Sequence, residues 1–324
     1  MTELKGTVIV TGGTIGLGYN AALTIARQYP EYQVVLASRS DAASSASKIH
    51  EATGHYNAVF LPLDLSDMTK VRAFVDDYLK HGFPPIKALL LNAALQFPYE
   101  VEYSPDAIEK TLAITHVGHA LLFYLLRGQF ANDTRIVVTA SGTHDPKTKS
   151  GMPDAVYTTA EEVARPDPKT VTKDGRQRYT TSKLCNVLWT YALHDRLNKG
   201  PVNGKKWTIT AFEPGLMPGT GLGRNYNFIF RFLWNQILPR IIPLLRIVLT
   251  PNIHTPEESG ANLARLAVDE DVKGLCGAYV DGREVAESSV MSYEKDKQDD
   301  LYQWTIEAIV ESKEEREAFE DIYG

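Results

Sequence analysis

Short apolar runs recur along the first half of the chain and alternate with stretches in which apolar residues repeat with a helical period. The runs are rich in β-branched residues and end in glycine or polar residues, which is typical of buried strands. They span residues 6–10, 34–37, 58–61, 88–91 and 135–139. This alternation predicts an α/β fold with a doubly wound parallel sheet and helices on both faces.

The first run leads into a turn rich in glycine, and a helical pattern follows it. Strand, glycine turn and helix in this order form the phosphate-binding unit of a Rossmann-like dinucleotide fold. Glycine permits the tight turn and the close approach of the backbone to a pyrophosphate, which amide groups at the helix start would bind. The residues that we expect to bind cofactor here are Gly12, Thr14, Ile15, Gly16, Leu17 and Gly18. The less favoured alternative is a glycine-rich turn without a ligand.

The second run ends at Ser38 and Arg39, about twenty residues beyond the glycine turn, where such folds contact the ribose of the cofactor. An acidic residue here selects NAD, whereas an arginine suits the 2′-phosphate of NADP. Asp41 is a competing signal, but it falls beyond the strand end. NADP(H) is therefore the expected cofactor.

Polar or small residues also follow the next three runs. They are Asp64 with Leu65, Asn92 with Ala93 and Ala94, and Ser141. Ligands of open α/β sheets bind beyond the carboxyl ends of the strands, so these residues are expected at the cofactor site. Asp64 could accept a hydrogen bond from the adenine amino group. Taken singly, Asp64 and Asn92 are more often turn formers or helix caps.

Tyr179 and Lys183 are four residues apart. In a helix this spacing places both side chains on one face, where a fixed positive charge lowers the pKa of a nearby phenol. Such a tyrosine can give or take a proton at a reacting oxygen. The pair alone is weak evidence, because this spacing is common on solvated helices.

In this order the motifs resemble the short-chain dehydrogenase/reductase family, and the resemblance covers nearly the whole chain. It rests on residues 11–18, 92–94, Ser141, Tyr179 with Lys183, and Pro214 with Gly215. Residues 181–186 and 217–222 are most similar to the branch of light-dependent protochlorophyllide reductases and retinol dehydrogenases. That branch prefers NADPH and large lipophilic substrates.

The resemblance implies a role for each residue of the site. Tyr179 would protonate a carbonyl oxygen as hydride arrives from the nicotinamide, and Ser141 would hold that oxygen. Lys183 would lower the Tyr179 pKa and bind the nicotinamide ribose. The nicotinamide end would be lined by Pro214, Gly215 and Thr220. The cofactor supplies the hydride in such enzymes, and the protein supplies orientation and hydrogen-bond donors.

The sequence departs from the family at Thr115, where family members usually carry an asparagine that helps to hold a proton-relay water. The favoured interpretation is a tolerated substitution; the alternative is that reduction is no longer the main activity. His116 and His119 share a helix face. With no cysteine or acidic partner beside them, we expect no metal.

Strands and helices alternate without a linker, so one domain is expected over residues 1–324. Residues 1–140 would be mainly the cofactor-binding half, and residues 179–324 the catalytic helix, the substrate lid and the C-terminal helices. Residues 142–178 are polar and predict a surface insertion with a short helix at 159–163, either a rim of the site or a mobile ornament. In the C-terminal helix, the predicted packed stripe comprises Leu301, Trp304, Ala308 and Ile309.

Residues 222–250 are rich in large apolar side chains, interrupted by Arg231, Arg240 and Arg246. No uninterrupted apolar stretch is long enough to span a bilayer. An apolar lid over a lipophilic substrate is the favoured interpretation. The alternatives are a dimer contact and a helix that lies on a membrane with its arginines at the headgroups.

Composition sets outer limits. The net charge of −6 and the isoelectric point near 5.8 give no basic footprint for nucleic acid. Cys185 and Cys276 form no metal or redox motif and fit a reducing compartment. The first strand begins near residue 6, so we expect no signal peptide and a cytoplasmic location. A homo-oligomer is left open.

Two functions follow from these patterns. The favoured one is an NADPH-dependent carbonyl reductase that acts on a lipophilic or aromatic ketone or aldehyde, such as a polyketide-like compound of secondary metabolism. The alternative is a protein that keeps NADP(H) as a structural or sensing ligand, or that catalyses a non-redox isomerisation or cyclisation. Protochlorophyllide reduction is a narrower hypothesis, because nothing in the sequence indicates a photosynthetic pathway.

Overall fold

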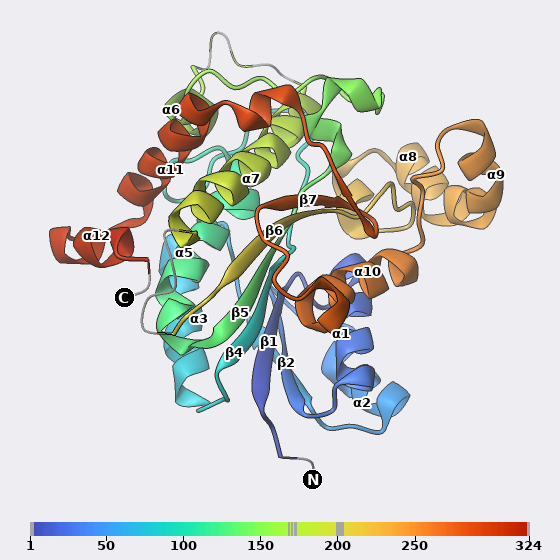
Figure 1. Cartoon of the computed structure of the whole chain (residues 1–324). Coiled ribbons are helices and arrows are strands. Elements are labelled where there is room, and N and C mark those ends of the chain that lie inside the picture. The colour runs from blue at the N-terminus through green and yellow to red at the C-terminus, as the bar shows by residue number, and fades with distance from the viewer. Residues whose placement is uncertain (1–2, 168, 170, 172–173, 199–203, 323–324) are drawn as a thin grey trace.

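The computed structural model describes residues 3–167, 169, 171, 174–198 and 204–322 (Figure 1). Among these, the strands are β1 (Gly6–Thr11), β2 (Tyr32–Ser38), β3 (Ala58–Pro62), β4 (Ile86–Leu91), β5 (Phe130–Thr139), β6 (Thr208–Glu213), β7 (Ala278–Asp281) and β8 (Glu284–Ala286). The longer helices are α1 (Gly16–Gln28), α2 (Ser45–Thr53), α3 (Met68–Lys80), α5 (Gly118–Leu126), α7 (Gly175–Leu197), α10 (Pro256–Val268), α11 (Lys295–Ile309) and α12 (Lys313–Glu320). The shorter ones are α4 (Lys110–Leu112), α6 (Ala160–Ala164), α8 (Phe228–Phe232) and α9 (Ile242–Val248).

The strands form one sheet in the order β3-β2-β1-β4-β5-β6-β7-β8. All neighbouring pairs are parallel except β7 and β8, which are antiparallel. The strand order reverses between β1 and β4, which is the switch point where such sheets bind ligands. The predicted Rossmann-like α/β fold is confirmed, and each of the five expected strands is present with slightly wider bounds.

Helices cover both faces of the sheet (Figure 1). One apolar core lies between the sheet and α3, α5, α7 and α11, with Phe74, Leu121 and Leu188 among its members. The other lies beneath α1, α2 and α10 and includes Ile25 and Leu263. Because apolar layers lie on both sides, all six residues of β1 are buried, which explains why its sequence does not alternate.

Most of helix α7 is buried, because 18 of its 23 residues lie in the interior. The Asp174 carboxylate accepts from the Arg176 amide and caps its start. The Arg178 guanidinium donates to the carbonyls of Tyr99 and Glu100 at 2.8 and 3.0 Å, which fixes the first turn. The orientation of this helix sets where the residues of its second turn point.

The insertion at residues 142–178 contains the expected short helix, α6, at Ala160–Ala164. It is attached to the body of the protein: the buried Tyr157 hydroxyl donates to Asp300 at 2.6 Å, and the Val156 amide donates to Thr181 at 3.0 Å. These bonds join the insertion to α11 and α7. Residues 168, 170 and 172–173 of the insertion lie outside the described part.

The predicted stripe of the C-terminal helix was wrong in part. Leu301 and Ile309 of α11 are buried as expected, and the half-buried Trp304 packs against the same core, whereas Ala308 is only half-buried. The buried face also includes Tyr302, Thr305 and Ile306. The indole of Trp304 also donates to Glu161 of α6 at 2.7 Å, which joins α11 to α6.

The apolar segment at residues 222–250 folds into short helices that project from the main body near α10 (Figure 1). Besides α8 and α9 it contains the helical turns Gly221–Asn225, Leu233–Ile237 and Leu238–Ile241. Within the described residues, no helix is both long enough and apolar enough to cross a membrane.

Candidate active site

A cavity of about 780 Å³ opens at the carboxyl ends of the central strands. Every residue predicted for the site lines it, although the residues come from seven separate stretches of the chain. They are Gly12, Thr14, Ile15, Gly16, Leu17, Gly18, Ser38, Arg39, Asp64, Leu65, Asn92, Ala93, Ala94, Ser141, Tyr179, Lys183, Pro214, Gly215 and Thr220. The fold therefore brings the predicted set together, while the role of each residue remains a prediction.

The glycine turn between β1 and α1 has the shape of a phosphate cradle. Gly12 and Gly16 have φ angles of +67° and +56°, which side chains rarely adopt. A Cβ on Gly18 would lie 2.4 Å from the Gly12 carbonyl oxygen and 2.7 Å from the Asn92 amide nitrogen. No larger residue fits there, and the start of α1 presents its free amide groups to the cavity. These features fit the pyrophosphate of a dinucleotide.

Two arginines meet at the expected 2′-phosphate position. Arg39 follows β2, and Arg224 reaches it from the apolar segment. Burial and the nearby positive charge of Arg39 lower the pKa of Arg224. Two like charges at one cavity wall favour an anion between them. Sequence analysis missed Arg224, because only the folded segment places it beside Arg39.

Asp41 does not compete for the ribose in the described arrangement. Both of its carboxylate oxygens accept from the Ser45 amide at 2.8 Å, at the start of α2. Its role is therefore that of a helix cap. Arg39, at the same strand end, is exposed and lines the cavity.

Asp64 and Asn92 line the cavity and also hold their turns. Asp64 accepts from the Ser66 hydroxyl at 2.7 Å and pairs with Lys70 at 3.3 Å, and its pKa is lowered because these bonds outweigh its burial. The Asn92 amide donates to the Thr11 carbonyl at 2.8 Å, joining β4 to β1. Both residues thus combine the turn-forming role that their type favours with a place at the cavity.

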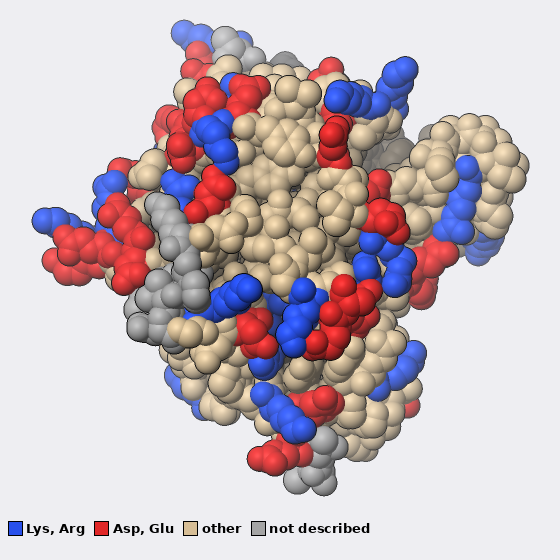
Figure 2. Space-filling model, in the orientation of Figure 1, with Lys and Arg blue, Asp and Glu red and all other residues tan. Residues whose placement is uncertain are grey.

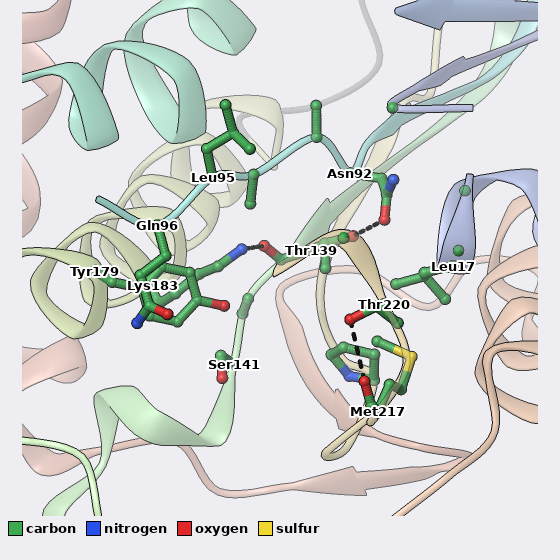
Figure 3. A pocket seen from close by; sticks show the side chains of 18 of the residues that line it. Leu17, Asn92, Leu95, Gln96, Thr139, Ser141, Tyr179, Lys183, Met217 and Thr220 are labelled. Atoms are coloured by element: carbon green, nitrogen blue, oxygen red, sulfur yellow. Dashed lines mark hydrogen bonds between the residues drawn. The ribbon is translucent and has the colours of Figure 1, made fainter. Parts of the chain in front are cut away.

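The predicted acid–base group lies on the cavity wall opposite the glycine turn (Figure 3). Tyr179 and Lys183 are on one face of α7 as expected, and the Lys183 ammonium lies 5.7 Å from the centre of the Tyr179 ring. Lys183 donates to the Thr139 carbonyl at 2.8 Å. Ser141, two residues beyond Thr139, accepts from the Thr143 hydroxyl at 3.1 Å. The hydroxyl, the phenol and the ammonium therefore converge on one part of the cavity.

The pKa of Tyr179 differs from the expectation that Lys183 would lower it. Burial raises this pKa well above its ordinary value, the negative charge of Glu213 raises it further, and the Ser141 hydroxyl opposes the change. Burial also lowers the pKa of Lys183 to about 8, although the charge of Glu213 opposes that shift. At neutral pH the phenol is thus held in its protonated form, and a proton donor is what reduction of a carbonyl requires.

Glu213 is a buried carboxylate that sequence analysis did not find. It ends β6 and accepts from the Gly142 amide, and from the Gly215 amide at 3.1 Å. It thereby joins the turn after Ser141 to the turn after Pro214. Burial and the charge of Asp281 raise its pKa to about 7, against the opposing effects of these amides and of Lys183. The strand-end rule that selected Asp64 and Asn92 would have found it.

Glu213 makes stability depend on pH. Between the ordinary glutamate pKa and about 7, the folded protein keeps a proton that the unfolded chain has released, so the free energy of unfolding falls as pH rises through this window. The raised pKa corresponds to about 3 kcal/mol. Between about pH 5 and about pH 8, the free energy of unfolding measured with urea should fall by about that much more for wild type than for Glu213→Gln. Glutamine loses one hydrogen bond at every pH, so the pH dependence is the quantity compared.

The control for this experiment is Glu284→Gln, which changes an exposed acid on β8, the edge strand of the same sheet. This variant should keep the pH dependence of wild type. If the unfolding free energies of Glu213→Gln and wild type fall in parallel, Glu213 does not titrate in this window.

Thr115 is buried, and its hydroxyl has no hydrogen-bond partner among the described protein atoms. A side-chain amide does lie beside Lys183, because Asn186 of α7 donates to the same Thr139 carbonyl as Lys183, at 3.0 Å. Asn186 is one helical turn beyond Lys183 and belongs to residues 181–186, which carry the family resemblance. After Arg224 and Glu213, it is the third residue of the site that was not predicted from the sequence.

His116 and His119 each bond a threonine. His116 lies 2.8 Å from the Thr305 hydroxyl of α11, and His119 lies 2.8 Å from the Thr11 hydroxyl at the end of β1. Burial lowers the pKa of His116 to about 3 and that of His119 to about 4, so both rings are neutral. In this arrangement they serve as buried links between elements.

The end of the cavity expected to hold the nicotinamide is closed by the turn after β6 and by an aromatic wall. Gly215 has a φ of +76°, and the Ser259 hydroxyl donates to the Pro214 carbonyl at 2.6 Å. Thr220 accepts at its carbonyl from the Trp234 indole at 3.0 Å. Beyond it, Tyr226, Phe230 and Trp234 form a stacked row that lines the cavity. This is the inner side of the apolar segment.

Comparisons with known proteins agree with the geometry. A sequence model described as short chain dehydrogenase matches residues 6–160. Protochlorophyllide reductase A of Oryza sativa subsp. japonica is 28% identical over 287 residues, which cover 83% of this chain and 70% of the relative. Short-chain dehydrogenase TIC 32 A of Brassica napus is 29% identical over 309 residues, covering 94% and 88%.

A solved structure of an uncharacterized protein from Mycobacterium Paratuberculosis superimposes with a TM-score of 0.66, at 20% identity, over 95% of this chain and 94% of that one. It supports the fold. A glycine turn of this shape, in one cavity with a serine, a tyrosine and a lysine, is typical of nicotinamide-dependent oxidoreductases. The comparisons place the chain with the short-chain dehydrogenases/reductases, and its relatives include protochlorophyllide reductases. Both relatives above are named as chloroplastic, so the cytoplasmic location stays a prediction.

Proposed function

We propose that this protein is an NADPH-dependent reductase of lipophilic or aromatic ketones and aldehydes. The observation that carries the proposal is the convergence of Ser141, Tyr179 and Lys183 on a cavity that also holds the glycine cradle and an aromatic wall. Bound NADPH would supply the hydride. The protein would supply orientation, exclusion of water and a proton.

In this proposal Tyr179 donates its proton to the carbonyl oxygen, because the phenol keeps that proton until a stronger base forms. The Ser141 hydroxyl donates a hydrogen bond to the same oxygen, which stabilises the negative charge that develops on it. Lys183, held by the Thr139 carbonyl, keeps a positive charge beside the phenolate that remains. Glu213 fixes the two turns on either side of these groups and favours the protonated phenol.

The cofactor preference rests on the two arginines. Arg39 and Arg224 both line the cavity and are close enough for their charges to interact, and their planar guanidinium groups match a phosphate. A ribose hydroxyl would leave their charges without an anion. We therefore assign the site to NADP(H) in preference to NAD(H).

The substrate class rests on the aromatic wall. Tyr226, Phe230 and Trp234 offer ring faces to a large flat or lipophilic molecule. A small aliphatic ketone would leave most of this wall in contact with water. Consumption of NADPH should therefore show kcat/KM values at least about tenfold higher for fused-ring ketones or quinones than for small aliphatic ketones, since each added apolar group contributes about 1 kcal/mol or more. Equal values would contradict this substrate class.

A second function, in which NADP(H) is retained as a structural or sensing ligand, is favoured only by Thr115 in place of the family's asparagine. Binding of NADPH without its consumption across the whole substrate panel would support that function. The presence of Asn186 beside Lys183 favours turnover.

A further inference from the structure

The projecting segment at residues 227–249 has two unlike sides. Its inner side is anchored: Trp234 is buried, and its indole bonds the Thr220 carbonyl. The rings of Phe230 and Trp234 continue a row that begins with Tyr226, just before the segment, with ring centres 4.3 and 5.7 Å apart. Its outer side faces solvent. A lid over the cavity would use only the inner side of this segment. It does not explain the large apolar side chains that the outer side exposes to solvent.

The outer side is rich in large apolar groups. Of the nineteen exposed large apolar side chains among the described residues, nine fall within these 23 positions. Phe228, Ile229 and Ile247 are 79, 71 and 85% exposed. We name as the outer face the residues Phe228, Ile229, Phe232, Leu233, Ile237, Leu244, Ile247, Val248 and Leu249. Such a concentration marks an interaction surface rather than scattered exposure.

The charge of this region is opposite to that of the whole chain. No aspartate or glutamate occurs between Glu213 and Glu257, whereas four arginines do, in a protein of net charge −6. Arg231 and Arg240 are exposed, while Arg246 is paired with Glu258 at the foot of the segment. Figure 2 shows the projection as neutral and basic, with acidic residues at its base.

We propose that the outer face docks on an anionic lipid surface. Short amphipathic helices with apolar groups on one side and arginines beside them lie in the plane of a membrane interface, with the apolar groups below the headgroups and the arginines among them. Arg231 and Arg240 would pair with anionic headgroups. A second copy of the chain is a poorer partner. In a symmetric contact between the two outer faces, the arginines of one copy would meet those of the other without an acidic residue to offset their charge.

The docking and the cavity share one segment. Phe230 and Trp234 line the cavity and Leu249 of the outer face reaches its rim, so an outer face lying on lipid would bring this wall close to the bilayer. A lipophilic substrate could then enter without crossing bulk water. This consequence depends on the proposed function, whereas the docking itself does not.

The test is co-sedimentation of the full chain with vesicles of phosphatidylcholine alone and of phosphatidylcholine containing about 30% phosphatidylserine. We expect binding to the anionic vesicles at least about tenfold stronger than to the neutral ones, since each arginine near the surface contributes about fivefold. The triple variant F228S/I229S/I247S and the double variant R231Q/R240Q should each lower the binding at least about tenfold. The control Y56S/V290S removes two equally exposed apolar groups elsewhere and should bind as wild type does.

Light scattering and circular dichroism of each variant complete the experiment. Circular dichroism spectra that match wild type show that a loss of binding reflects the surface rather than misfolding. No binding to either vesicle by the folded wild type would overturn the proposal, as would equal binding to both. A molar mass that falls from dimer to monomer in F228S/I229S/I247S, without vesicle binding by wild type, would instead assign the face to a second copy.

Discussion

Replacing Tyr179 by phenylalanine should lower kcat for the best carbonyl substrate by about 10²- to 10⁴-fold. The phenol is buried at the cavity wall, where its burial and the charge of Glu213 keep it protonated, so its removal leaves the Ser141 hydrogen bond but no group that transfers a proton to the carbonyl oxygen. Phenylalanine preserves the packing of α7. Steady-state NADPH oxidation measures the loss, and NADPH binding, followed by fluorescence, should change little.

The matched control is Tyr191→Phe. Tyr191 is also buried on α7, but its hydroxyl bonds Ser288 at 2.7 Å and does not line the cavity. This variant should keep kcat within about twofold. If Tyr179→Phe also stays within twofold, the phenol is not the proton donor and the proposed reaction is wrong.

Replacing Arg39 or Arg224 by alanine should raise the Kd for NADPH about tenfold or more and leave that for NADH nearly unchanged. Each guanidinium would contribute charge-assisted hydrogen bonds to the 2′-phosphate, which are worth about 1.5–3 kcal/mol, and NADH has no such phosphate. Isothermal titration of both cofactors measures the change. The effects of the two replacements should not be additive, because both arginines share one anion.

Arg27→Ala, an exposed arginine on the side of α1 away from the cavity, is the control for a general effect of charge. It should change neither Kd by more than about twofold. Equal losses of NADPH and NADH affinity in Arg39→Ala would refute the 2′-phosphate assignment.

The sheet and most of the site residues could be predicted from the sequence because the patterns that indicate them are local. A buried strand, a glycine turn and a helix are contiguous, and the carboxyl ends of parallel strands meet at one edge whatever the loops do. Asp64, Asn92 and Ser141 could therefore be placed at one rim without knowledge of the loops. Tyr179 and Lys183 needed only the helical repeat.

The site residues that were not predicted from the sequence depend on contacts between distant segments. Arg224 reaches Arg39 only after residues 221–249 fold against the cavity, and Asn186 meets Lys183 at a carbonyl of another element. The sign of the Tyr179 pKa shift was also missed. It follows from burial and from Glu213, and neither is visible in the spacing of Tyr179 and Lys183.

A crystal structure of the protein with NADP⁺ tests the convergence of this site most directly. We expect the nicotinamide C4 atom between Ser141 and Tyr179, within reach of a carbonyl held by both hydroxyls, and the 2′-phosphate between Arg39 and Arg224. Density for a nucleotide bound elsewhere, or for a Tyr179 hydroxyl turned away from the nicotinamide, would contradict it.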